Sequence, residues 1–118
     1  MVKVLYVDDE HINLNLFEIS FRKDFQIIKT ISAHEAIEIF KNNEIDVVVT
    51  DLKMPEMSGV DLIREIKRIK PNQNCIILTA YYEPQLIRSE EFKTMVFSYV
   101  VKPFKKVDLQ KIILSAIA

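Results

Sequence analysis

Short apolar stretches alternate with segments of helical periodicity along most of the chain. Five such stretches each have the length of one β-strand: Val2–Val7, Phe25–Thr30, Ile45–Thr50, Cys75–Leu78 and Met95–Val101. All but the second are apolar at nearly every position, which is typical of strands covered on both faces of a parallel sheet. The second stretch is more polar, and we therefore expect it at an edge of the sheet.

Helices are predicted between and after these strands. Apolar residues recur at positions i, i+3, i+4 and i+7 in three segments: Ala33, Ala36, Ile37 and Phe40; Gly59, Leu62, Ile63 and Ile66; and Leu109, Ile112, Ile113 and Ala116. Ser32 followed by Glu35 predicts a capping box at the start of the first of these helices. The segment Pro84–Lys93 is the weakest predicted helix, because Pro84 suits a first turn but the apolar stripe is thin.

The predicted helix His11–Phe21 is apolar on two faces. Its apolar residues form two opposite stripes: Ile12, Leu16 and Ile19, and Leu14, Phe17 and Phe21. One stripe must face the sheet. The other is either an exposed contact surface for a partner or a surface covered by neighbouring loops, and the pattern leaves both possibilities open.

Five repeats of strand and helix predict an α/β fold of (βα)5 type. Right-handed crossovers favour a doubly wound five-stranded parallel sheet with helices on both faces. In the flavodoxin-like strand order 2-1-3-4-5, ligands bind beyond the carboxyl ends of the strands, near the switch between the first and third. We expect residues 1–118 to form a single domain.

Polar residues of complementary chemistry stand where these strands end. Asp8 and Asp9 follow the first strand, Asp51 the third, Thr79 ends the fourth and Lys102 follows the fifth. Three converging carboxylates would force one of them to hold a proton unless a cation neutralised them. Oxygen ligands suit Mg²⁺, which also binds phosphate oxygens readily.

This set of residues fits phosphoryl transfer. A carboxylate can act as a nucleophile and form an aspartyl phosphate. The transferred group needs positive charge on its oxygens, which Mg²⁺ and Lys102 would supply, and the hydroxyl of Thr79 could donate a hydrogen bond to a further oxygen. Reasoning from the residues alone leaves open which of the three carboxylates is the nucleophile.

Composition and charge narrow the remaining classes. The net charge of −1 argues against nucleic-acid binding by this domain. No apolar run approaches the roughly 20 residues of a membrane helix and no signal peptide is visible, so we expect a cytoplasmic protein without membrane contact. Residues 1–59 carry 6 basic and 11 acidic side chains and residues 60–118 carry 10 and 6, as expected if the first half builds a cation site. Cys75 is expected to be a buried thiol.

At its strand ends the sequence resembles the receiver domains of two-component response regulators, over essentially the whole chain. Four motifs carry the resemblance: Val7-Asp8-Asp9-Glu10 with Asn13, Asp51-Leu52-Lys53-Met54-Pro55-Glu56-Met57-Ser58-Gly59, Leu78-Thr79-Ala80, and Tyr99-Val100-Val101-Lys102-Pro103-Phe104. It implies a signalling switch rather than an enzyme with a separate substrate. A histidine kinase or histidine phosphotransfer protein would donate the phosphoryl group, and the surface of the fourth helix, fifth strand and fifth helix would respond.

The resemblance also implies roles at the acidic edge. Asp51 would be the phosphoacceptor and Asp9 a direct ligand of Mg²⁺, for which Mn²⁺ or another divalent cation could substitute. Asp8 would help to hold the ion through water, and the backbone carbonyl of Lys53 would be a further ligand. Lys102 matches the family's invariant lysine.

Further implied roles concern switching and lifetime. Thr79 matches the switch hydroxyl, and Tyr99 the aromatic residue that rotates inward when Thr79 moves toward the phosphoryl group. Lys53 and Tyr81 stand at positions that tune the lifetime of the phosphorylated form, and Tyr81 could shield the group from water. The peptide bond before Pro103 is implied to be cis, and a phosphorylation-dependent homodimer through the fourth-helix surface is a further implied possibility.

Three other functions fit the residues less well. A haloacid-dehalogenase-type phosphotransferase needs a second acid two residues after its nucleophile, where this chain has Lys53. A flavodoxin-type cofactor binder needs a phosphate-binding loop after the first strand, and a receiver reduced to protein binding would not need the complete set of acids, hydroxyl and lysine. The chain departs from usual receivers at the turns Ile31-Ser32-Ala33 and Lys93-Thr94-Met95. Its single glycine, Gly59, predicts a close backbone approach or an unusual dihedral angle near the site.

Overall fold

A computed structural model describes residues 1–117. Five strands form one sheet in the order β2-β1-β3-β4-β5, and every neighbouring pair is parallel. The strands are β1 (Lys3–Val7), β2 (Gln26–Thr30), β3 (Val47–Thr50), β4 (Cys75–Thr79) and β5 (Ser98–Val101). The predicted fold class and strand order are therefore confirmed, and β2 lies at an edge as its polar pattern predicts.

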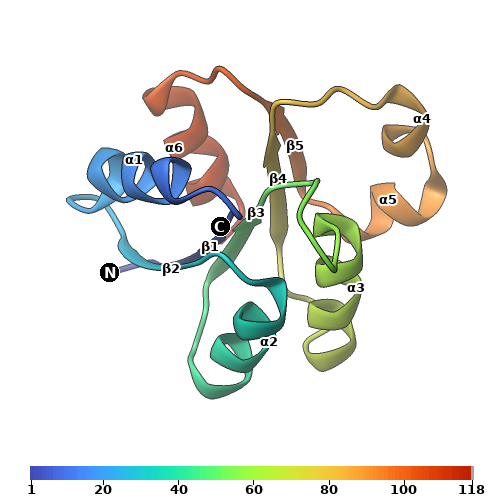
Figure 1. Ribbon diagram of the computed structural model, residues 1–118, viewed down its shortest axis with the longest axis horizontal. Coiled ribbons are helices and arrows are strands. Elements are labelled where there is room, and N and C mark those ends of the chain that lie inside the picture. Colours follow the sequence, from blue (N-terminus) through green and yellow to red (C-terminus); the bar gives the residue numbers. More distant parts are fainter. Residues whose placement is uncertain (118) are drawn as a thin grey trace.

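Helices cover both faces of the sheet (Figure 1). They are α1 (His11–Phe21), α2 (Ala33–Asn42), α3 (Gly59–Ile69), α4 (Pro84–Ile87), α5 (Glu90–Met95) and α6 (Lys106–Ser115). Helices α1 and α6 pack with one buried cluster of the sheet, and α2, α3 and α5 pack with the other. None of the helices in the described part of the chain is long and apolar enough to cross a membrane.

The two stripes of α1 have different environments. Leu14, Phe17 and Phe21 are buried against the sheet, whereas Ile12, Leu16 and Ile19 are 71%, 57% and 60% exposed. The first stripe therefore supplies core packing, and the second remains a free apolar surface. The burial of Cys75 is confirmed as well.

The segment predicted as one helix over Pro84–Lys93 is two short helices, and that prediction is wrong. Ser89 has an extended backbone, and its hydroxyl accepts a hydrogen bond from the amide of Phe92 at 3.1 Å, so it caps a new helix, α5. Because α5 continues to Met95, the fifth strand begins at Ser98 and is shorter than the predicted Met95–Val101. The surface expected around a fourth helix is thus formed by α4, α5, β5 and α6.

The capping box at the start of α2 is only half formed. The hydroxyl of Ser32 accepts from the amide of Glu35 at 3.2 Å, as predicted. The Glu35 carboxylate instead accepts from the hydroxyl of Thr30 at the end of β2, and that hydroxyl accepts from the Ser32 amide. Thr30 therefore takes the role expected of Glu35 and joins the strand end to the helix start.

Candidate functional site

The carboxyl ends of β1 and β3 bring three carboxylates together. Val7 pairs with Thr50 in the parallel register, and the amide of Asp51 donates to the carbonyl of Val7 at 2.9 Å. Asp8, Asp9 and Asp51 each place a carboxylate oxygen within 4.8 Å of the others. The predicted convergence is thus present, and its all-oxygen chemistry suits a hard divalent cation.

Thr79 and Lys102 complete the edge from β4 and β5. The amide of Lys102 donates to the carbonyl of Thr79 at 2.7 Å, which places the two residues side by side. Thr79 is fully buried, and the Lys102 ammonium lies 3.3 Å from Oδ2 of Asp8. The Lys102–Pro103 peptide bond is cis, as the resemblance implies. Lys102 thus forms an ion pair with one of the three acids, and a cation can neutralise the negative charge of the others.

The environment of Asp51 disfavours its ionised form. The residue as a whole is 9% exposed. Burial, and then the negative charge of Asp8, raise its pKa above the ordinary value, whereas the amide of Leu52, the hydroxyl of Thr79 and the ammonium of Lys102 act in the opposite direction. A divalent cation beside Asp51 would remove this destabilisation of its ionised form, which supports the fit of the site to such an ion.

Gly59 holds the loop after β3 against Asp51. The amide of Gly59 donates to the carbonyl of Leu52 at 2.8 Å. A Cβ atom at position 59 would lie 2.1 Å from the carbonyl oxygen of Asp51. The predicted close backbone approach is therefore confirmed. The positive φ of this loop belongs instead to Glu56, at 69°.

Known proteins are similar to this chain over most of its length. The family model of the response regulator receiver domain matches residues 4–114. The chain belongs to the receiver domain family. It is 32% identical to the chemotaxis protein CheY of Thermotoga maritima over 105 residues, which cover 87% of each protein.

Two solved structures are also similar to this receiver. A response regulator receiver domain protein from Clostridium thermocellum is 36% identical, with a TM-score of 0.90, and the match covers 99% of this chain and 94% of that one. The response regulator TrrA from Thermotoga maritima, in complex with Mg²⁺ and beryllium fluoride, is 29% identical with a TM-score of 0.86, covering 98% and 99%. This receiver is accordingly a phosphoryl-accepting signalling switch of a two-component system.

The residues expected to switch and tune the receiver lie together beyond Thr79. The hydroxyl of Tyr99 donates to the carbonyl of Tyr81, and its ring packs on Phe92 with centroids 5.7 Å apart. The Lys53 ammonium lies 4.3 Å from the centre of the Tyr81 ring and 3.2 Å from a carboxylate oxygen of Glu83. These contacts join the loop after β3 to the loop after β4.

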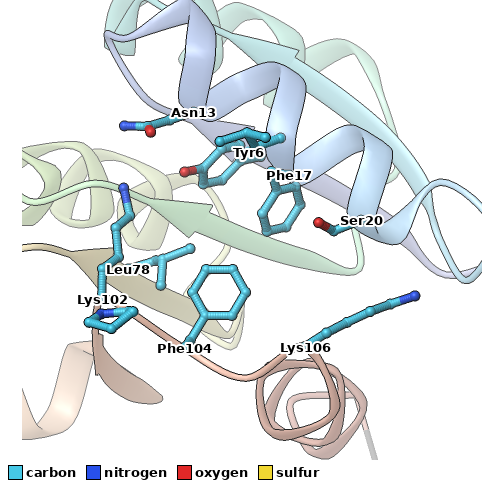
Figure 2. A pocket seen from close by; sticks show the side chains of 10 residues that line it. Tyr6, Asn13, Phe17, Ser20, Leu78, Lys102, Phe104 and Lys106 are labelled. Carbon is cyan, nitrogen blue, oxygen red and sulfur yellow. The ribbon is translucent and has the colours of Figure 1, made fainter.

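Sequence reasoning missed Tyr6, which contacts the acidic cluster directly. Its buried hydroxyl donates to Oδ2 of Asp8 at 2.8 Å. Figure 2 shows Tyr6 beside Asn13 and Lys102 at one end of a cavity of about 450 Å³ between α1 and the segment after β5. The alternation of strand residues could have pointed to Tyr6, because residues two apart face the same side of a sheet.

The receiver without a bound cation should become more stable when Asp51 is replaced by asparagine. The pKa of Asp51 in the folded protein lies above its ordinary value. The free energy of unfolding of the wild type therefore falls as the pH rises from the ordinary pKa through the raised pKa. Asparagine removes this loss at neutral pH, and its advantage should shrink as the pH falls. Urea unfolding in EDTA at several pH values measures this, with Asp108→Asn in the exposed first turn of α6 as a control. A variant that is less stable than wild type at neutral pH would contradict the prediction.

Proposed function

We propose that Asp51 accepts the phosphoryl group and that Mg²⁺ is held by Asp9, Asp51 and the backbone carbonyl of Lys53, with Asp8 acting through water. The convergence of three carboxylates within 4.8 Å of one another, next to the ammonium of Lys102, is the observation that carries this proposal. The complex of TrrA with Mg²⁺ and beryllium fluoride supports it by similarity. The bound cation would neutralise the acids and the charge on the transferred phosphoryl group.

The hydrogen bonds of Asp51 indicate which of its oxygens attacks. Oδ1 accepts from the amide of Leu52 at 2.7 Å, which leaves Oδ2 as the freer oxygen. Oδ2 would form the new O–P bond as the N–P bond of a phosphohistidine breaks, and the departing imidazole would take a proton from solvent. The receiver would thus catalyse its own phosphorylation.

Lys102 and Thr79 would then respond to the new charge. The Lys102 ammonium, now near Asp8, would move to a phosphoryl oxygen, because the phosphoryl group brings about −1.5 to −2 charge. The Thr79 hydroxyl would donate to another oxygen, and the rotation of Tyr99 would break its hydrogen bond to Tyr81. The surface of α4, α5, β5 and α6 would change as a result, and a homodimer could form there.

The exposed stripe of α1 would bind the phosphoryl donor. Receiver domains interact with histidine kinases or phosphotransfer proteins. Ile12, Leu16 and Ile19 form a free apolar surface, and Asn13 on the same helix reaches the end of the cavity where Lys102 lies (Figure 2). A donor on this stripe would therefore bring its histidine toward Asp51. We place this exchange in the cytoplasm.

Phosphorylation by a small-molecule donor tests the proposal. Acetyl phosphate and Mg²⁺ should increase the mass of the protein by one phosphoryl group, and EDTA should prevent the increase because the acids then repel the donor. Asp51→Asn should abolish the gain, whereas Asp108→Asn should retain it. Intact-protein mass spectrometry measures both. An undiminished gain in Asp51→Asn would overturn the assignment of the phosphoacceptor.

Tyr81 should lengthen the life of the phosphorylated receiver. Its ring contacts the ammonium of Lys53, two residues after Asp51, and could cover the phosphoryl group from attacking water. Tyr81→Ala should therefore shorten the half-life several-fold, while Tyr82→Ala at the exposed neighbouring position should not change it. The decay of the phosphorylated mass after removal of acetyl phosphate measures the half-life. Equal half-lives for wild type and Tyr81→Ala would refute the shielding role.

A further inference from the structure

Tyr6 is a buried polar residue that none of the assigned roles uses. It lies on β1 two residues before Asp8 and is 1% exposed. Its ring stacks on Phe17 of α1, with centroids 4.0 Å apart and planes 13° from parallel. A tyrosine hydroxyl keeps its proton at neutral pH and can donate a hydrogen bond. Strand and helix packing therefore fix a hydroxyl donor beneath the acidic cluster.

The hydrogen bonds of Asp8 leave it little freedom. Its Oδ2 accepts from the Tyr6 hydroxyl at 2.8 Å and from the Lys102 ammonium at 3.3 Å. Its Oδ1 accepts from the amide of Glu10 at 3.0 Å. An ionised carboxylate offers about four acceptor sites, so only one site, on Oδ1, remains for a ligand or a water. Because only one acceptor site is free, the Asp8 carboxylate is already oriented in the cation-free protein.

We propose that Tyr6 is a positioning residue of the cation site: its hydroxyl holds Oδ2 of Asp8, and so turns Oδ1 toward the water through which Asp8 would hold the cation. This inference rests on the cation site in the proposed function. Without the hydroxyl, Asp8 could rotate, and Lys102 could take Oδ2 for itself. Both changes would leave the carboxylate less well aligned for the ion.

A variant that lacks only the hydroxyl of Tyr6 tests its hydrogen bond separately from the packing of its ring. Tyr6→Phe keeps the ring and its stacking on Phe17, so the packing between β1 and α1 is preserved. The partners that orient metal-binding carboxylates commonly change metal affinity 10- to 100-fold when they are removed. The dissociation constant for Mg²⁺ should therefore rise by about 10-fold or more in Tyr6→Phe. Tyr82→Phe, at an exposed tyrosine, should leave it unchanged.

Titration calorimetry with Mg²⁺ alone tests the inference, since it needs no phosphoryl transfer. A wild-type Kd retained in Tyr6→Phe would overturn the positioning role and leave the proposed cation site intact. Wild-type protein that does not bind Mg²⁺ would overturn the cation site, and the positioning role with it. Two-dimensional NMR of the cation-free proteins verifies that the variants are folded.

A double variant separates positioning from a general structural effect. If Tyr6 acts through Asp8, Tyr6→Phe should not change the Mg²⁺ affinity further once Asp8→Asn is present, because their effects would not add. A 10-fold loss that persists in the Asp8→Asn background would overturn the proposal, since the hydroxyl would then act by another route.

Discussion

Replacing Gly59 with alanine is expected to lower the free energy of unfolding by about 3 kcal/mol, as in strongly overpacked sites. The added Cβ would lie 2.1 Å from the carbonyl oxygen of Asp51 and 3.1 Å from Cα of Leu52. Both are backbone atoms that cannot rotate away. The better helix propensity of alanine would stabilise the folded protein by at most about 1 kcal/mol, so the steric clash has the larger effect. The melting temperature should fall by roughly 10 °C.

Phosphorylation of Gly59→Ala should fall with its stability, because the carbonyl that must move belongs to the proposed phosphoacceptor. Thermal unfolding and the mass gain with acetyl phosphate measure the two effects. His11→Ala is the matched control, since His11 is the exposed first residue of α1, just as Gly59 is the first residue of α3. A Gly59→Ala protein as stable as His11→Ala would contradict the close approach.

Replacing Lys102 with alanine is expected to have opposite effects on phosphorylation and on cation binding. The rate with acetyl phosphate should fall about 100- to 1,000-fold, the usual effect of losing a donor to the developing charge. The Mg²⁺ affinity should rise, because the ammonium 3.3 Å from Asp8 no longer competes for the acids. A substitution that merely damaged the site would weaken both.

The exposed Lys105 offers a control for charge in the same segment. Lys105→Ala lowers the net charge equally and should leave both quantities near their wild-type values. Mass spectrometry of samples quenched at successive times gives the rate of phosphorylation, and titration calorimetry gives the Mg²⁺ affinity. A Lys102→Ala protein that is phosphorylated at the wild-type rate would remove Lys102 from the proposed mechanism.

The sheet and the acidic edge could be predicted because their signals are local. Each strand is a short apolar run, and parallel strands deliver their last residues to one edge. The gathering of Asp8, Asp51 and Lys102 follows from strand order alone. Proposing Asp51 as the phosphoacceptor needed the family resemblance, because the three aspartates have the same side-chain chemistry and the sequence alone does not distinguish them.

Other features depended on contacts that the sequence does not encode locally. The hydroxyl of Tyr6 reaches Asp8 because Phe17, from α1, holds the ring in place. The break between α4 and α5 depends on Ser89 capping a new helix, although serine is also tolerated within helices. Which stripe of α1 faces the sheet could not be predicted, because both are apolar and packing decides between them.

Chemical mapping of the phosphoryl group tests the central claim most directly. After treatment with acetyl phosphate and Mg²⁺, borohydride reduces an aspartyl phosphate to homoserine and thereby marks the residue that was phosphorylated. Peptide sequencing by mass spectrometry should find homoserine at position 51, with Asp8 and Asp9 unchanged. Homoserine at position 8 or 9, with Asp51 intact, would contradict the account.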